Sequence, residues 1–438
     1  MKKIIAILLL AVLILSFSGC ARNDENTLYF LNFKPESAAA YNEIAEKYKE
    51  ETGVTLRVVT AASGTYEQTL KSEISKSDAP VLFQLNGVIG YAAWKNYCKD
   101  LSDTEIYSHL TDPELAITSG DGVYGIPAVV EGYGIIYNEA ITDRYFALSG
   151  RATTYQSMDE INTFDKLSAL VKDMTARKSE LGIEGVFAST SLKSGEDWRY
   201  QTHLANLPIY YEFKEKGTDI SKDDLSEVAF SYQAQYKQLF DLYLQNSTTD
   251  PKLLGSKQVA DSMAEFALGR CAMVQNGNWA WSQIQGVSGN TVESEKIKFL
   301  PIYIGADNEE NQGLCVGTEN YFAINSQASA EKQKMAEDFL NWLYTSETGK
   351  DLVTNKLNFI APYDTFEEEE VPADPLGKEV YEWMSKENVN TVPWIFSIFP
   401  SQNFKTDFGA ALLQYAQGTK SWNEVVSTFV TRWKEEAT

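Results

Sequence analysis

The chain has 438 residues, with 38 basic and 61 acidic side chains, which gives a formal net charge of −23. Because so acidic a protein repels a phosphate backbone, nucleic-acid binding is not expected. Hydrophobic residues make up 44% of the sequence, enough for a large core, and the length suits two or three domains of roughly 100–200 residues. The two histidines, His109 and His203, are too few for a multi-histidine metal site and are expected on the surface or in packing.

The first residues have the pattern of an export signal. Lys2 and Lys3 precede the apolar run Ile4–Leu15, which is too short to span a membrane. The following FSGC resembles a bacterial lipobox, which implies that residues 1–19 are removed and that Cys20 carries a diacylglyceryl group. Two acyl chains hold a protein at a bilayer, so residues 20–26 would form a lipidated tether. The alternative is a plainly secreted protein with a coincidental cysteine.

Three further cysteines, Cys98, Cys271 and Cys315, have the spacing of neither a zinc site nor a CxxC motif. They are expected to be buried as small apolar residues, and a disulfide is possible but not predicted. No later segment reaches 18 consecutive apolar residues, so no further membrane contact is predicted.

In chain order, the first predicted element is a strand over 27–33, with Ser37 as the N-cap of a helix that ends at Gly53. A strand over 54–59, a helix over 66–75 and the strand VLFQL after Pro80 follow. This alternation continues to about residue 140 and predicts a sheet covered by helices on both faces. The second half is richer in helix, with apolar stripes over 330–345 and over 422–433.

Four stretches together resemble the extracytoplasmic solute-binding proteins of carbohydrate ABC importers, the maltose-binding-protein-like family 1. Their order and spacing match across nearly the whole mature chain, and the second is the most specific. They are DGVYGIPAVVEGYGIIYNEA (121–140), FALGRCAMVQNGNWAWS (266–282), GTENYFAINSQ through NWLYTSETGKDLV (317–353), and the C-terminal segment 408–436 with ALLQYAQGTKSWNEVVSTF.

This resemblance implies an α/β, two-lobed periplasmic-binding-protein fold (type II-like), with a ligand cleft between lobes joined by two or three crossings. The first lobe would be 27–130 with 300–345, and the second 131–299 with 346–438. Crossings are expected near Ala128–Glu131, near Leu300-Pro301 and near Ser346.

An oligosaccharide presents C–H patches on its ring faces and hydroxyl groups along its edges. Flat aromatic side chains match the faces, and carboxylates, amides and basic groups match the edges. Each stacked ring buries roughly 50–100 Å2, which contributes about 1–2.5 kcal/mol. The 9 Trp, 24 Tyr and 21 Phe could supply such platforms.

The resemblance assigns ligand contacts first to the NGNWAW segment and to the first crossing. Trp279 would stack on the sugar, whereas Trp281 is expected to pack in the core. Glu131 would accept hydrogen bonds from sugar hydroxyls, and Tyr133 would lie beside it. The alternatives are a core anchor for Trp279 and a solvated carboxylate for Glu131.

Other candidates lie in the turns that follow strands. Gln84 and Asn86 occupy the turn after VLFQL, where the chain has amides in place of the family's common carboxylate or aromatic residues. Lys34 and Glu36 follow the first strand, where the alternative is a simple helix cap. The weakest candidates are Trp198 and Trp394, each equally compatible with a core role, and Glu319, which could be an ordinary surface-loop residue.

The predicted function is capture of an oligosaccharide and its delivery to membrane ABC permease subunits, by a monomer anchored through Cys20 on the outer face of the cytoplasmic membrane. No cofactor, metal or enzymatic activity is expected. Two alternatives stay open. The same fold could bind a polyamine, a peptide or a metal, for which Tyr210-Tyr211 resembles an iron site, or the chain could be a surface glycoside hydrolase, which needs two carboxylates about 5–10 Å apart.

Overall fold

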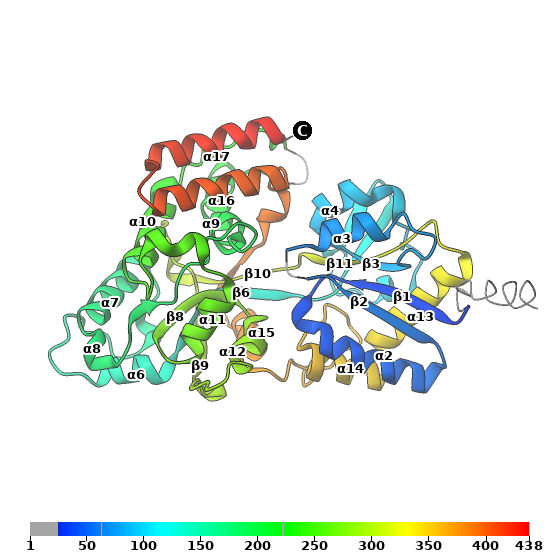
Figure 1. The fold of residues 1–438 in the computed structure, drawn as a ribbon, viewed down its shortest axis with the longest axis horizontal. Coiled ribbons are helices and arrows are strands. Elements are labelled where there is room, and N and C mark those ends of the chain that lie inside the picture. The colour runs from blue at the N-terminus through cyan, green and yellow to red at the C-terminus, as the bar shows by residue number, and fades with distance from the viewer. Residues whose placement is uncertain (1–24, 63, 221–222, 438) are drawn as a thin grey trace, which may run out of the picture.

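The computed structural model describes residues 25–62, 64–220 and 223–437 (Figure 1). The expected leader 1–19, Cys20 and most of the tether lie outside the described residues. Two six-stranded sheets form the centres of two bodies, which we call the first and the second lobe. Figure 1 shows them side by side, with strands running between them.

The first sheet has the order β2-β1-β3-β11-β5-β4, with β1, β2 and β3 parallel and β11 antiparallel to its neighbours. Its strands are β1 (Thr27–Asn32), β2 (Thr55–Thr60), β3 (Leu82–Asn86), β4 (Ile117–Ser119), β5 (Gly122–Pro127) and β11 (Asn320–Ile324). The helices of this lobe are α2 (Ala38–Thr52), α3 (Tyr66–Glu73), α4 (Gly87–Trp94), α5 (Glu105–Ser108), α13 (Ala330–Thr345) and α14 (Glu347–Leu352).

The second sheet has the order β12-β10-β6-β8-β7, and β9 also pairs with β6. Its strands are β6 (Glu131–Asn138), β7 (Gly185–Phe187), β8 (Cys271–Gly277), β9 (Ile297–Leu300), β10 (Gln312–Gly317) and β12 (Asn390–Pro393). The helices of this lobe are α6 (Glu139–Ala147), α7 (Phe164–Ala176), α8 (Lys178–Leu181), α9 (Ala205–Lys216), α10 (Gln233–Gln245), α11 (Val259–Ala267), α12 (Ala280–Gln285), α15 (Pro375–Ser385), α16 (Gln402–Ala416) and α17 (Trp422–Glu436).

Strand β1 explains why helices cover both faces of the first sheet. Alternate side chains of a strand point to opposite faces, and all of its central residues are apolar. Leu28 and Phe30 enter the core under α2 and α13, whereas Tyr29 and Leu31 enter a separate core under α3. The predicted arrangement of sheets covered by helices is therefore confirmed.

The chain passes between the sheets at three places. Residues 128–130 connect β5 to β6, and only Thr318 and Glu319 separate β10 from β11. The third passage lies within 358–374, since Phe359 and Tyr363 pack in the first lobe while Leu376 packs in the second.

Two of these passages differ from the expected crossings near Leu300-Pro301 and Ser346. Residues 315–317 stay in the second lobe because they pair with residues 131–133 of β6. Residues 346–357 stay in the first lobe because α14 packs against α2, and Leu352 and Val353 enter its core.

Single residues determine where several helices begin and end. Helix α2 ends at Gly53, whose left-handed φ of 75° suits glycine, as expected. Ser37 does occupy the N-cap position, but its side chain makes no capping hydrogen bond, because the short 3₁₀ turn Pro35–Ser37 precedes the helix. Cys98, Cys271 and Cys315 are buried and unpaired.

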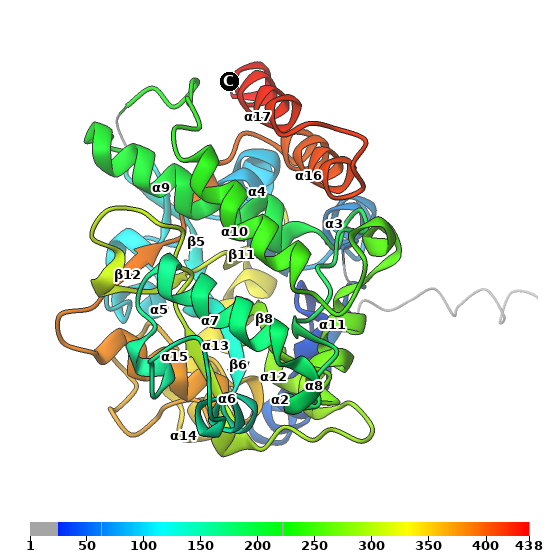
Figure 2. The ribbon, with the colours of Figure 1, turned by 90° about the vertical axis from the view of Figure 1, so that its left-hand side faces the viewer.

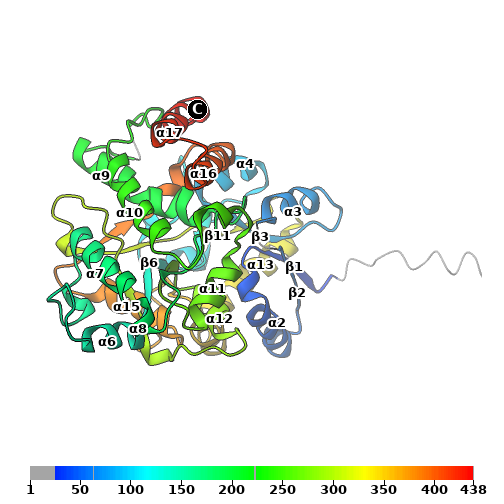
Figure 3. The ribbon, with the colours of Figure 1, turned by 60° about the vertical axis from the view of Figure 1, so that its left-hand side comes forward.

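The C-terminal helices α16 and α17 form an antiparallel pair on the second lobe, beside α9 and α10 (Figure 2). Rotating the molecule brings α4 of the first lobe into view beside α16 (Figure 3). The contact that joins this region to α4 is made by residues 395–398, which precede α16. Within the described ranges, no helix is both long and apolar enough to cross a bilayer.

Candidate ligand-binding cleft

An open pocket, with about 460 Å3 of empty space that includes open solvent, lies between the two lobes beside the passages. Of the predicted site residues, Lys34, Glu36, Glu131 and Trp279 line it. The remaining lining residues are Ser37, Asn278, Trp281, Ser282, Lys356, Leu357, Asn358, Phe359 and Asp374.

Trp279 lies at the boundary of this cavity, directly after β8 and before α12. Its ring folds back over Gly277, where a Cβ atom would lie only 2.2 Å from the ring carbons. Glycine at position 277 is therefore needed for this placement. The indole is half-buried, and Trp281, in contrast, is 8% exposed and packs in the core, as expected.

A group of aromatic rings extends from Trp279 into the interior of the second lobe. The centroid of its ring lies 5.9 Å from that of Trp198 and 6.2 Å from that of Trp394. Tyr133 contacts Trp394 at 5.6 Å and donates its hydroxyl hydrogen to the carbonyl of His203 at 2.8 Å. His203 packs among these rings, and burial holds its pKa well below its ordinary value, so its imidazole is neutral.

A buried ion pair connects the lobes at the first passage. The Nζ atom of Lys34 lies 2.7 Å from Glu131 Oε1 and 3.4 Å from Glu36 Oε1. Burial alone would lower the pKa of Lys34, but the two carboxylates raise it, so the ammonium stays charged. Glu131, predicted as an acceptor for a ligand, thus already accepts one hydrogen bond from the protein.

Glu319 lies at the second passage, held by its carbonyl, which accepts from the N–H of Gly87 at 2.9 Å. Burial raises the pKa of its carboxyl group, while the nearby cations Lys405 and Lys34 lower it. Lys405, on α16, is 9% exposed and was not singled out in the sequence. Lys405 is the fourth residue of α16, and the helical pattern there gives no sign that it lies near Glu319.

Gln84 and Asn86 lie at the C-terminal end of β3, in the middle of the first sheet, and do not line the cavity. Gln84 Oε1 accepts from the N–H of Phe33 at 2.6 Å, so this side chain fixes the turn that carries Lys34. Asn86 is half-buried opposite Asn320 in the β3–β11 pairing. Both amides are therefore placed near the second passage.

Several buried polar atoms around this cleft have no hydrogen-bond partner in the described part of the chain. Buried polar groups are almost always satisfied, so such a concentration needs an explanation. The atoms are Gln84 Nε2, the three guanidinium nitrogens of Arg199, Gln275 Oε1, Trp279 Nε1, Thr318 Oγ1, Asn320 Oδ1 and Trp394 Nε1. Sequence patterns could not reveal them, because each depends on what the fold leaves unpaired.

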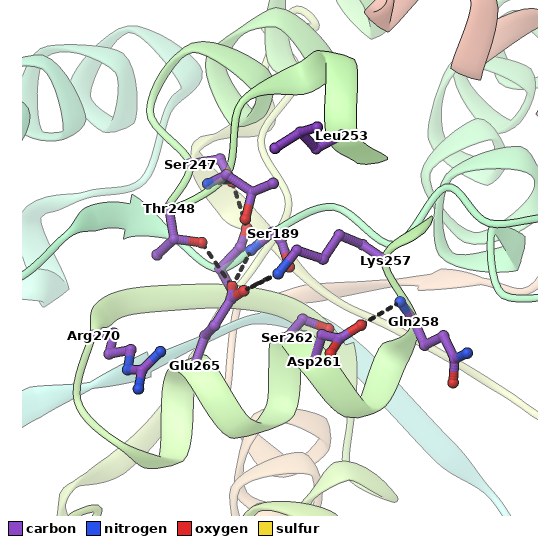
Figure 4. Close-up of polar contacts among 12 residues, drawn as sticks. Ser189, Ser247, Thr248, Leu253, Lys257, Gln258, Asp261, Ser262, Glu265 and Arg270 are labelled. Atoms are coloured by element: carbon purple, nitrogen blue, oxygen red, sulfur yellow. Dashed lines mark hydrogen bonds and ion pairs between the residues drawn. The ribbon is translucent and has the colours of Figure 1, made fainter. Parts of the chain in front are cut away.

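The segment that leads to Trp198 is fixed by the carboxylate of Glu265 on α11 (Figure 4). Glu265 accepts hydrogen bonds from the N–H of Ser189 at 2.7 Å, from Thr248 Oγ1 at 2.7 Å and from Lys257 Nζ at 3.0 Å. Although burial raises the pKa of Glu265, these donors outweigh it and hold the pKa below its ordinary value.

We expect Glu265→Gln to lower the free energy of unfolding by about 3 kcal/mol at pH 7, because an amide cannot accept all of these bonds. A lowered pKa in the folded state stabilises the protein above the ordinary pKa of 4.5, so the difference from wild type should shrink as the pH falls below that value. Urea unfolding from pH 7 to pH 3.5 measures this. Asp261→Asn on the same helix, which keeps an acceptor for the N–H of Gln258 and loses only a charge near the helix start, should cost less than about 1 kcal/mol.

The metal alternatives find no support in the geometry. Among the residues that the structure describes, no group of three or more His, Cys, Asp or Glu side chains is placed to hold a metal ion. The hydroxyl of Tyr211 donates to Gln312 in the core, and Tyr210 packs against the same core.

Two lobes with a cavity between them define a bilobed ligand-binding protein. Residues 43–378 match the model of the bacterial extracellular solute-binding protein family. Because this match spans well over half of the chain, the chain belongs to that family, and the resemblance noted in the sequence is confirmed. No curated protein sequence matches the chain significantly.

Solved structures share the fold over nearly their whole length. A chitin oligosaccharide binding protein has a TM-score of 0.70 and 18% identity, covering 94% of this chain and 98% of that one. The GacH receptor of Streptomyces glaucescens GLA.O, known unliganded and with acarbose, has a TM-score of 0.68 and 14% identity over 94% and 98%. Maltose-bound MalE3 of T. maritima has a TM-score of 0.68 and 15% identity over 93% and 99%.

Proposed function

We propose that this protein captures an oligosaccharide in the cleft and delivers it to the permease subunits of an ABC importer. The observation that supports a sugar is the combination of a half-buried indole at the cavity boundary and several buried polar atoms without partners in the segments around it. The half-buried ring of Trp279 offers a platform for a pyranose face. The unpaired amides and indole N–H groups offer partners for hydroxyl groups.

The ligand would act by favouring one arrangement of the lobes. Residues from both lobes line the cavity, so a sugar that contacts both sides stabilises the closed form over an open one. The permease would then recognise that closed form. The names of the similar structures, which include oligosaccharide, acarbose and maltose complexes, agree with this ligand class.

The proposal includes the location. The lipobox-like FSGC would place a lipid on Cys20 and keep the monomeric protein at the outer face of the cytoplasmic membrane, close to its permease. In this role the protein carries out no chemistry and uses no cofactor. Solute-binding proteins of this family bind rather than transform their ligands, in line with the family description.

A thermal-shift screen of the soluble chain from Ala21 onward tests the proposal. The panel contains mono- and oligosaccharides, polyamines, peptides and divalent or ferric ions. A sugar at 100 times its Kd should stabilise the folded state by about 2.7 kcal/mol, which is a readable shift. A response to a polyamine, peptide or metal with none to any saccharide would refute the carbohydrate function and leave the family assignment intact.

A further inference from the structure

Arg199 is a buried cation that does not itself line the cavity but lies behind it. The ring of its neighbour Trp198 is 5.9 Å from that of Trp279 at the cavity boundary, and Glu36 of the cavity lining is close enough to affect the pKa of Arg199. Arg199 begins the π-helical turn Arg199–Leu204, and its side chain is only 2% exposed. Its guanidinium carbon lies 3.9 Å from the centroid of the Trp198 ring. None of its three side-chain nitrogens has a hydrogen-bond partner in the described part of the chain. Short π-helical segments occur frequently at functional sites.

No carboxylate among the described residues pairs with this guanidinium. Glu36 and Glu196 lie close enough to influence its pKa, but neither comes within the 4.0 Å of an ion pair. Asp197, its neighbour in sequence, instead accepts a hydrogen bond from Gln201 and packs against Gly409 on α16. A charged group buried without a partner is costly, so the site favours an external anion.

A second buried cation lies on the adjoining helix. Lys405 belongs to α16, which packs against the turn that contains Arg199. The ion pairs of the described residues do not include Lys405, and the carboxylates that influence it are Glu319 and Glu67. Lys34, by comparison, is already neutralised by Glu131 and Glu36. Of these two cations without an ion pair, Arg199 is the one whose side-chain nitrogens are all buried without a hydrogen-bond partner among the described residues.

We propose that the ligand is an acidic oligosaccharide, whose uronate carboxylate pairs with the guanidinium of Arg199 while a sugar ring stacks on Trp279. This inference rests on the proposed function and narrows its ligand class. A planar guanidinium binds a carboxylate through two parallel hydrogen bonds, which satisfies both its donors and its charge. A neutral hydroxyl group accepts a hydrogen bond but leaves the charge uncompensated.

The test compares ligands that differ only in that charge. Oligogalacturonates, alginate oligomers and glucuronate-bearing xylo-oligosaccharides are titrated calorimetrically, each beside its neutral methyl ester. At least one free acid should bind about tenfold or more tightly than its ester. Arg199→Gln should weaken binding of that acid by about 30-fold and leave the ester within about threefold. Arg199→Lys, which keeps the charge but loses the fork, should lie between.

Arg144→Gln, an exposed residue on α6, is the matched control and should change neither affinity. Circular dichroism of each variant without ligand separates misfolding from lost binding, and Arg199→Lys supplies the result if Arg199→Gln fails to fold. Esters or other neutral sugars that bind as tightly as the acids would overturn this inference while keeping the proposed function. If no saccharide of either charge binds, the proposed function fails with it.

Discussion

Trp279→Ala should weaken saccharide binding roughly 5- to 70-fold and lower the free energy of unfolding less than truncation of a fully buried tryptophan would. The ring is half-buried at the cavity boundary, so its removal takes away ligand contact more than core packing. A stacked sugar ring contributes about 1–2.5 kcal/mol, which corresponds to roughly 5- to 70-fold in affinity. Calorimetric titration with the best ligand of the thermal-shift panel measures the change.

Two further variants make this prediction specific. Gly277→Ala should reproduce the loss of affinity, since its Cβ would overlap the Trp279 ring and displace it. Trp433→Phe, on the buried face of α17, should lower the melting temperature and leave Kd unchanged. Equal affinity for wild type and Trp279→Ala would mean that the indole is only a packing residue.

Lys34→Met should lower the free energy of unfolding by about 3 kcal/mol or more, because it leaves the Glu131 carboxylate buried without its cation. Glu131→Gln should also destabilise, and the double variant should cost less than the sum of the two. Chemical denaturation of the four proteins gives the coupling energy, which we expect to exceed about 1 kcal/mol.

The exposed pair of Lys47 and Glu50 on α2 offers the control for this cycle. Lys47→Met should leave stability unchanged within error, since solvent screens the charges. Additive effects of Lys34→Met and Glu131→Gln would show that the short contact between the lobes contributes nothing beyond each side chain alone.

Elements with a strong local pattern were predicted well from the sequence. Helix α13 spans Ala330–Thr345, the predicted range, because a continuous apolar stripe and a capping Ser329 define both its face and its start. Trp279 and Lys34 were predicted as ligand contacts from motifs at strand ends. Both line the cavity, and their contact with a ligand stays a prediction. Here local sequence and tertiary structure specify the same arrangement.

Other features depend on pairings between distant segments. Strand β10 belongs to the second sheet only because it pairs with β6, and no local pattern in 312–317 reveals that pairing. The second passage was therefore expected near Leu300-Pro301, before this strand, whereas it follows the strand. Arg199 and Lys405 belong to no motif. That both are buried, and that the guanidinium of Arg199 has no hydrogen-bond partner among the described residues, follows only from the fold. The need for glycine at position 277 is likewise visible only in the structure, where the Trp279 ring lies in the space that a Cβ atom would take.

The second passage is only two residues long, which limits how the two lobes can rotate relative to each other. Each residue has two soft backbone torsions, so Thr318 and Glu319 together offer only four. Gly317, just before them, lies so close to Trp394 that an added Cβ would be 2.6 Å from the indole. Few backbone rotations are therefore available at the second passage. A ligand that shifted the Trp394 indole would also move the backbone at Gly317, next to that passage.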